Sequence, residues 1–289
     1  MNRLKKWFLY FIFVTTTMVF LIYYLFPSDS VKRYIIFKIS QINPDLEVSI
    51  GHVFPTFPPG LRFDTVSFEY SGIQMLLAEE MRVVPKLASL LAARRILLFS
   101  VNANSGSVNG KAYIIGQNKK LQLDMEAVIS GMQLADIAVI KNLTAVKFSG
   151  VLGMEISYQS GPKNPHTLRA RLEMLDIELQ SEKLFLNLDF MAFERIEAYL
   201  SMRDGRMELE SCNFTGDQFD GMLSGFGVLK NPVNKSTIML SGRLNAHHLF
   251  PSQLDGNLPP AILNMLKSES ADISILIKGP IENPSFSFE

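Results

Sequence analysis

The residues that could carry chemistry are few and lie far apart in the sequence. The chain has four histidines, two of them adjacent at His247-His248, and a single cysteine, Cys212. Neighbouring residues of a strand point to opposite faces of a sheet, so the adjacent histidines would not bind one metal ion together. A lone cysteine forms neither an intramolecular disulfide nor a multi-cysteine metal site. We therefore expect Cys212 to be a small apolar residue rather than a nucleophile.

Catalytic signatures give no stronger candidate. The sequence contains no phosphate-binding loop, nucleophile elbow, H-E-x-x-H or kinase motif. The charge pairs Glu79-Glu80 and Arg94-Arg95 are typical of solvated ends of elements. Acid–base catalysis would need carboxylates brought together from distant strands, which a sequence does not reveal. We expect a protein that is not an enzyme, with no catalytic, cofactor-binding or metal-binding residue, and keep a membrane-tethered hydrolase as an alternative.

Charge and composition also limit the partners. Lys+Arg and Asp+Glu both number 28 in the 289 residues, so the formal net charge is zero. No basic stripe runs along the chain, and we expect no nucleic-acid partner. Charged residues make up 19% of the chain, below the roughly 25% of typical domains. One N-terminal segment explains part of that imbalance.

This segment, residues 7–26, predicts a transmembrane anchor. It contains no charged residue, and about 20 helical residues cross the roughly 30 Å hydrocarbon core of a bilayer. Aromatic residues lie near both ends, where amphipathic rings favour the membrane interfaces. The residues that we assign to the anchor are Trp7, Tyr10, Phe13, Val14, Tyr23, Tyr24 and Phe26.

A cleaved signal peptide is the competing interpretation of this segment. It would have an apolar region of about 7–15 residues followed by a small-residue cleavage site. Here the apolar run is longer, and Phe26-Pro27-Ser28-Asp29 follows it. Arg3, Lys5 and Lys6 precede the run, which predicts a cytoplasmic N-terminus and a C-terminal domain on the far side.

Beyond the anchor, a short amphipathic helix is expected at residues 31–42, and the prolines of FPTFPPG, residues 54–60, interrupt regular structure. Period-two alternation of apolar and polar residues then dominates, which is typical of antiparallel strands with one buried face. In Leu121–Ile129, for example, every second residue is apolar. The expected strands are 121–129, 146–158, 168–174, 184–190, 219–229, 238–244 and 273–281, and short helices are expected at 85–95, 132–140 and 260–266.

The predicted fold class is mainly β: a single N-terminal transmembrane helix followed by a curved antiparallel β-sheet domain with a few short helices. Glycines interrupt several strands, at Gly150, Gly225, Gly242 and Gly279. Glycine inside a strand usually marks a bulge, a bend or a close backbone approach. We divide the chain into a cytoplasmic tip and anchor at 1–30, a connecting amphipathic segment at 31–45 and a β-rich domain at 46–289.

The apolar faces of these strands allow two interpretations. They form either a closed core or the partly uncovered face of an open, curved sheet, which could accept acyl chains or a partner protein. The 21 Phe and 14 Met favour the second, because both side chains adapt to irregular apolar ligands. The candidate groove residues are Phe219, Leu223, Leu229, Ile238, Leu240, Ile273, Ile275 and Ile277.

Several strings of the sequence, in order, carry a resemblance to a known family. They are FPTFPPG at 54–60, PKLASLLAARRILL at 85–98, SGSVNGKAYI at 105–114, FSGVLGMEISY at 148–158, FDGMLSGFGVL at 219–229, STIMLSGRL at 236–244 and IKGPIENPSFSF at 277–288. Together with the single anchor, they resemble the GspN family, protein N of the bacterial type II secretion system. The last string is also similar to the ends of AsmA-like proteins, which are membrane-anchored β proteins that handle lipid in the bacterial envelope.

The resemblance to the GspN family implies an inner-membrane protein with a periplasmic domain, a non-enzymatic accessory of the type II secretion machine. It would contribute to assembly or stability of that machine, with other envelope components of the system and membrane lipids as partners. The AsmA-like features imply an alternative, a lipid-binding or lipid-transfer protein with an apolar β groove. This chain is short for a conduit across the whole periplasm.

Overall fold

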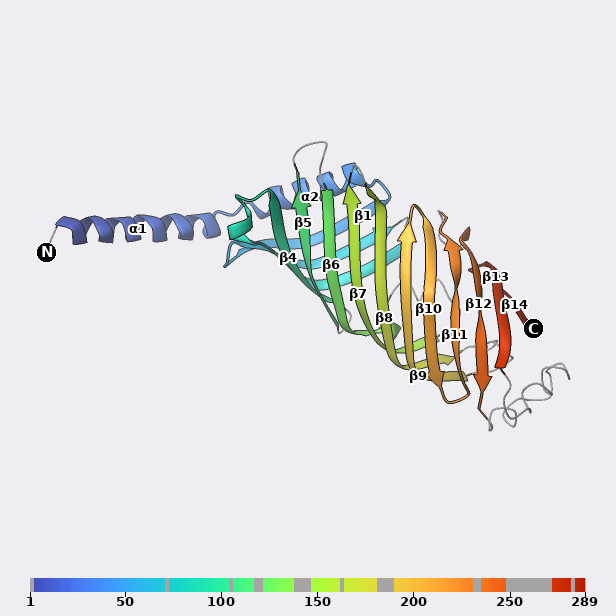
Figure 1. Ribbon diagram of the computed structural model, residues 1–289. Helices are drawn as coiled ribbons and strands as arrows, with labels where there is room; N and C mark the ends of the chain where they lie inside the picture. Colours follow the sequence, from blue (N-terminus) through green and yellow to red (C-terminus); the bar gives the residue numbers. More distant parts are fainter. Residues whose placement is uncertain are drawn as a thin grey trace.

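The protein consists of two α-helices and one antiparallel sheet in a computed structural model that describes residues 3–70, 73–103, 106–116, 122–137, 147–161, 164–180, 190–230, 235–247, 272–281 and 284–288. Helix α1 (Arg3–Tyr24) projects away from the sheet, and α2 (Ser28–Ile42) lies beside its first strand (Figure 1). The N-terminus and the last strand are at opposite ends of the molecule in this view.

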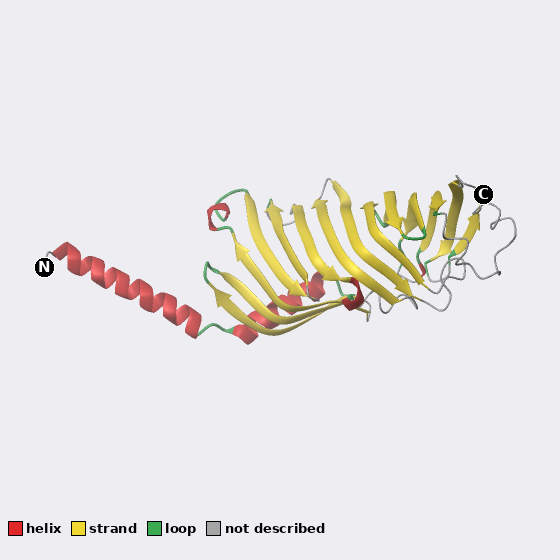
Figure 2. Cartoon of the chain, turned by 90° about the horizontal axis from the view of Figure 1, so that it is seen from below, coloured by secondary structure: helices red, strands yellow, loops and turns green. Residues whose placement is uncertain are grey.

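The sheet has fourteen strands, and its spatial order is the order of the chain. Each strand pairs antiparallel with the next, which confirms the mainly β prediction. In both views β1–β3 run at a steep angle to β4–β9, so the sheet is strongly bent (Figures 1 and 2). The strands are β1 Leu46–Thr56, β2 Gly60–Tyr70, β3 Ile73–Pro85, β4 Arg94–Ala103, β5 Gly106–Ile115, β6 Gln122–Gln133, β7 Lys147–Gly161, β8 Asn164–Gln180, β9 Phe190–Arg203, β10 Arg206–Gly216, β11 Phe219–Val228, β12 Thr237–Ala246, β13 Asp272–Pro280 and β14 Ser285–Phe288.

The register sorts the side chains into an apolar face and a polar face. Val101 of β4 pairs with Val108 of β5, which pairs with Ile129 of β6, and the row continues through Met154 and Leu172. Since side chains alternate along a strand, the residues between these rows point the other way. They include serine, asparagine, glutamate and arginine. The alternation predicted for residues 121–129 is confirmed over Met125–Ile129, whereas Leu123 is exposed and Asp124 half-buried.

Helix α2 completes the N-terminal end of the sheet. Its apolar residues Val31, Ile35, Ile36 and Ile39 pack against the core of β1–β4, as the amphipathic pattern predicts. Three side chains bond to carbonyl oxygens of β1: Ser28 Oγ to Val53 at 2.8 Å, Lys32 Nζ to Gly51 at 3.1 Å and, from α1, Tyr23 Oη to Thr56 at 2.6 Å. The helix thereby covers a strand edge that would otherwise offer unpaired backbone groups.

Strand glycines mark the irregular points of the sheet, as expected from the sequence. Gly150, with φ of +127°, lies at a shift in the β7–β8 register, while Gly225 and Gly279 have φ of +152° and +121°. These values favour glycine because an L side chain rarely adopts them. At Gly242 the reason differs: a Cβ there would overlap the carbonyl oxygen of Met222 on the neighbouring strand.

Two of the expected helices are wrong, and the anchor helix ends two residues earlier than expected. Over residues 85–95 the chain forms the end of β3, a single turn η1 (Leu87–Ser89) and the start of β4. Strand β6 runs to Gln133 and is followed by η3 (Leu134–Asp136), so 132–137 is not an α-helix. Helix α1 ends at Tyr24, and Phe26 packs against the β1–β4 core. The expected helix at 260–266, residues 138–140 and the expected strand at 184–189 lie outside the described residues.

Candidate functional site

The apolar face across β6–β13 divides into two strips that run perpendicular to the strands. The first, which we call the buried strip, lies at one end of each strand, and its side chains are almost inaccessible. Phe193, Phe214 and Phe219 form its centre, with ring centroids 5.6–6.2 Å apart in edge-to-face geometry. The other buried members are Met132, Leu134, Leu152, Ile177, Met191, Leu244, Ile273 and Ile275.

The second strip, which we call the open strip, lies nearer the other end of the same strands. The register aligns its outermost row directly: Met125 pairs with Tyr158, Tyr158 with Leu168, Leu168 with Met202, and Met202 with Met207. The row then passes Gly227 and reaches Ile238. All six of these large side chains are only half-buried. The next row ends with Leu209, Leu240 and Ile277, which are also half-buried.

The structure places seven of the eight predicted groove residues on the apolar face. Phe219, Ile273 and Ile275 belong to the buried strip. Leu223, Ile238, Leu240 and Ile277 are half-buried, and the last three lie in the open strip. Leu229 follows the end of β11 and is 37% exposed, so it is not part of the face. Sequence reasoning missed the contribution of β6–β10, although the same alternation marks those strands.

Few described elements cover the sheet from outside it. Those that pack on it are α2, on β1, and the single turns η1 and η3, beside β4 and β7. Each of them has most of its contacts with a single strand, and α2 also packs against the core of β1–β4. The half-buried open strip therefore has no described helix over it, whereas the β1–β4 core does.

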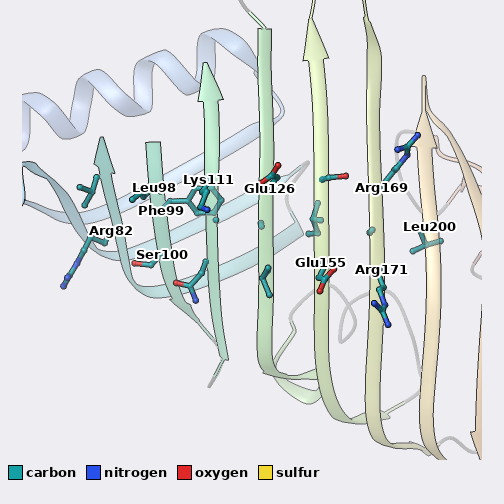
Figure 3. A pocket seen from close by; sticks show the side chains of 18 of the residues that line it. Arg82, Leu98, Phe99, Ser100, Lys111, Glu126, Glu155, Arg169, Arg171 and Leu200 are labelled. Carbon is teal, nitrogen blue, oxygen red and sulfur yellow. The ribbon is translucent and has the colours of Figure 1, made fainter. Parts of the chain in front are cut away.

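The polar face carries a hollow of about 1030 Å³. It extends from β3 to β10. Side chains from neighbouring strands form its walls, and Figure 3 shows Lys111, Glu126, Glu155, Arg169 and Arg171 among them. Lys111 is directly opposite Glu126, and Glu155 directly opposite Arg171.

Charges of both signs are thus interleaved across this hollow. Opposite charges in cross-strand pairs stabilise a sheet by themselves, by roughly 0.2–1 kcal/mol each. Arg171 also lies over the ring of Tyr199, with 5.5 Å from its guanidinium carbon to the ring centroid. Apolar side chains, among them Val84, Leu98 and Val128, also line the hollow, and no concentration of one charge would select an anion or a cation.

The residues with chemical potential lie apart. Cys212 belongs to the apolar face, opposite Ala198 and Leu223, and burial raises the pKa of its thiol. His247 donates from Nδ1 to the carbonyl oxygen of Asp217 at 3.0 Å, and its Nε2 lies 3.2 Å from Asp220. His248 is outside the described residues. Among the residues that were described, no three His, Cys, Asp or Glu side chains gather into a possible metal site.

The anchor residues occupy two environments. Lys5–Tyr24 is long and apolar enough to cross a membrane, and Trp7, Tyr10, Phe13, Val14 and Tyr24 are exposed on it. Tyr23 instead bonds to Thr56. By length and composition alone, this helix is a possible single span or a signal sequence.

Comparisons with known proteins identify no relative. No family model, no curated protein and no solved structure matches this chain.

Proposed function

We propose that this protein is a membrane-anchored, non-enzymatic lipid-binding protein whose apolar sheet face holds acyl chains. The observation that carries the proposal is the open strip: a row of large apolar side chains, aligned by register over β6–β10, interrupted by Gly227 on β11 and resumed by Ile238 on β12, all only half-buried. Apolar surface that stays partly accessible over several neighbouring strands is typical of a binding site.

The chemistry of the open strip suits an acyl chain. Three of the six residues in its outermost row are methionines, Met125, Met202 and Met207, whose flexible thioethers adapt to irregular apolar ligands. Transfer of each methylene group from water is worth about 0.8 kcal/mol, so ten methylenes along the strip would gain at most about 8 kcal/mol. Such a gain needs no directional polar contact, and the hydroxyl of Tyr158 in this row is already bonded to His166.

Membrane anchoring supports the same function, because it keeps the strip near a source of lipid. We propose that α1 is retained as a single span of a bacterial inner membrane, with the basic N-terminus in the cytoplasm and the sheet in the periplasm. N-terminal sequencing of the mature protein and protease access in spheroplasts test this arrangement. A mature chain that begins near Ser28, or a sheet protected from protease in spheroplasts, would contradict it.

Photo-crosslinking tests the lipid-binding face with matched pairs of sites. A photoreactive residue replaces Leu240 or Leu123 on the apolar face, and Met239 or Asp124, the neighbours on the polar face, in the control chains. After irradiation of intact membranes, mass spectrometry of the purified full chain identifies the adducts. We expect phospholipid on the Leu240 and Leu123 variants and several-fold less on the controls. Equal labelling on both faces, or none on the apolar one, would contradict acyl-chain binding.

The GspN-like strings support a second candidate, an accessory role in assembly or stability of the type II secretion machine. Most of them fall on strands or turns of the described sheet, including Phe148–Tyr158 in β7 and Phe219–Val228 in β11. Under this proposal the partners are envelope proteins of the secretion system. The same crosslinking experiment separates the candidates, because protein adducts from the apolar face would favour a secretion partner over a lipid.

A further inference from the structure

Three segments meet at the end of the sheet where α1 arrives. Tyr23, in the last turn of α1, bonds to the carbonyl oxygen of Thr56 at the β1–β2 hairpin. Leu61 at the start of β2 pairs with Val83 near the end of β3, so the β3–β4 connection lies at the same end as this hairpin. Figures 1 and 2 agree in placing the β1–β2 and β3–β4 turns at the end of the sheet that is nearest to α1.

The tips of both turns are apolar and exposed. Phe57 of the β1–β2 hairpin is 85% exposed and is followed by two prolines. In the β3–β4 connection, Leu91 is fully exposed and Leu87 and Leu90 are about half exposed. Single apolar residues on a surface are ordinary, but four large ones on two adjacent turns form a patch that needs an occupant.

The β3–β4 connection holds its leucines outward by a specific set of bonds. The buried Ser89 donates its hydroxyl to the Lys86 carbonyl at 2.6 Å and accepts the Ile96 N–H at 2.9 Å. Lys86 N–H also bonds to the Ile96 carbonyl at 2.9 Å. The one small polar side chain thus faces inward and the leucines face out, which is the reverse of the arrangement expected for a turn in water.

The charged residues within the two segments that form this patch are all basic. Lys86, Arg94 and Arg95 flank the leucines, and no acidic residue occurs in 54–63 or 85–101. Arg94 lies over the ring of Tyr113, 3.8 Å from its centroid. Exposed leucine and phenylalanine bordered by lysine and arginine is the composition of surfaces that enter the lipid headgroup region, especially where anionic lipids are present.

We propose that these two turns, Phe57–Pro59 and Leu87–Leu91, insert into the leaflet in which α1 ends and seat the sheet against the membrane. The inference rests on the membrane anchoring proposed above and adds a second, peripheral contact to it. The basic residues bind the headgroups, and the apolar tips occupy the acyl region just below them.

Site-specific fluorescence tests the insertion. In the full chain, Cys212→Ala removes the only native thiol, and Phe57→Cys, Leu91→Cys, Phe13→Cys or Asn109→Cys introduces one for an environment-sensitive nitrobenzoxadiazole probe. The proteins are placed in nanodiscs of phosphatidylcholine, with or without phosphatidylglycerol. The probe at position 13 reports the environment of the membrane span. The probe at position 109, which is exposed on the polar face, reports an aqueous environment.

We expect blue-shifted emission, several-fold stronger than at position 109, from probes at 57 and 91, and a further increase when phosphatidylglycerol is present. Water-like emission at 57 and 91 with apolar emission at 13 would overturn the insertion but leave the anchor intact. Water-like emission at 13 as well would overturn the anchoring itself. Insertion that does not respond to phosphatidylglycerol would overturn the role of the basic residues.

Discussion

The first four strands and the later strands β6–β13 share one sequence pattern but bury it differently. In β1–β4 the apolar face is closed around Val53 and Ala78, which have no exposed surface and over which α2 packs, while residues farther out, such as Val83 and Phe99, are half-buried. In β6–β13 the apolar face is closed along one strip and half-exposed along the other.

The difference shows what alternation in a sequence specifies. It assigns each side chain to a face, because the period of a strand is two. Whether that face becomes a buried core depends on another element that packs over it. At the β1 end of the sheet, this element is α2. Its side chains also satisfy carbonyls on the edge of β1, so a single helix closes both an edge and a face.

The largest expected effect comes from a charge in the closed region. Val53→Asp should destabilise the sheet by about 3–5 kcal/mol, because an unpaired carboxylate would replace a side chain with no access to water. A loss of this size approaches the total stability of many domains, about 5–15 kcal/mol. Thermal and denaturant unfolding of the full chain in detergent micelles, followed by far-UV circular dichroism, measures it.

Two variants make this experiment a test of the comparison. Ser49→Asp, at an exposed position of the same strand, should change the unfolding free energy by less than about 0.5 kcal/mol. Leu240→Asp, in the open strip, should cost clearly less than Val53→Asp because water reaches that position. Equal losses at Val53 and Leu240 would show that the open strip is in fact a closed core.

A smaller effect is expected from the strand glycines of the later region. Gly225→Ala should cost about 1–3 kcal/mol, because φ is +152° and a Cβ there would lie 2.8 Å from the Cα of Leu240. Gly153→Ala is the matched control, since its Cβ would meet neighbouring atoms only at 3.7 Å or beyond. The same unfolding experiment measures both variants. An unchanged free energy of unfolding in Gly225→Ala would contradict a strained bend in β11.

Much of the fold could be predicted from the sequence because it depends on local patterns. The amphipathic segment at 31–42 became α2, and strand glycines such as Gly150 and Gly225 mark irregular points of the sheet. The helix predicted at 85–95 failed because Leu87, Leu90 and Leu91 fit a helical face in spacing alone. All three leucines are exposed, and the hydroxyl of Ser89 stabilises a tight turn in place of a helix.

The candidate site was less accessible to prediction, because it depends on register between strands and on which faces remain uncovered. Nothing local distinguishes Phe219, in the buried strip, from Leu240, in the open one. Likewise, the sequence does not show that the exposed leucines of the β3–β4 connection lie at the end of the sheet nearest to α1.

The smallest effect concerns Cys212, which lies between the two strips on β10. Burial raises the pKa of its thiol, and only the thiolate reacts with iodoacetamide. At neutral pH the alkylation of Cys212 in the folded chain should therefore be several-fold slower than that of an exposed thiol, such as Leu91→Cys in the Cys212→Ala chain in detergent. The rate at Cys212 should keep rising with pH beyond the point where the exposed thiol levels off, because a raised pKa delays ionisation. Equal rates and equal pH profiles would mean that water reaches the middle of the apolar face freely, and the boundary between the buried and open strips would then be wrong.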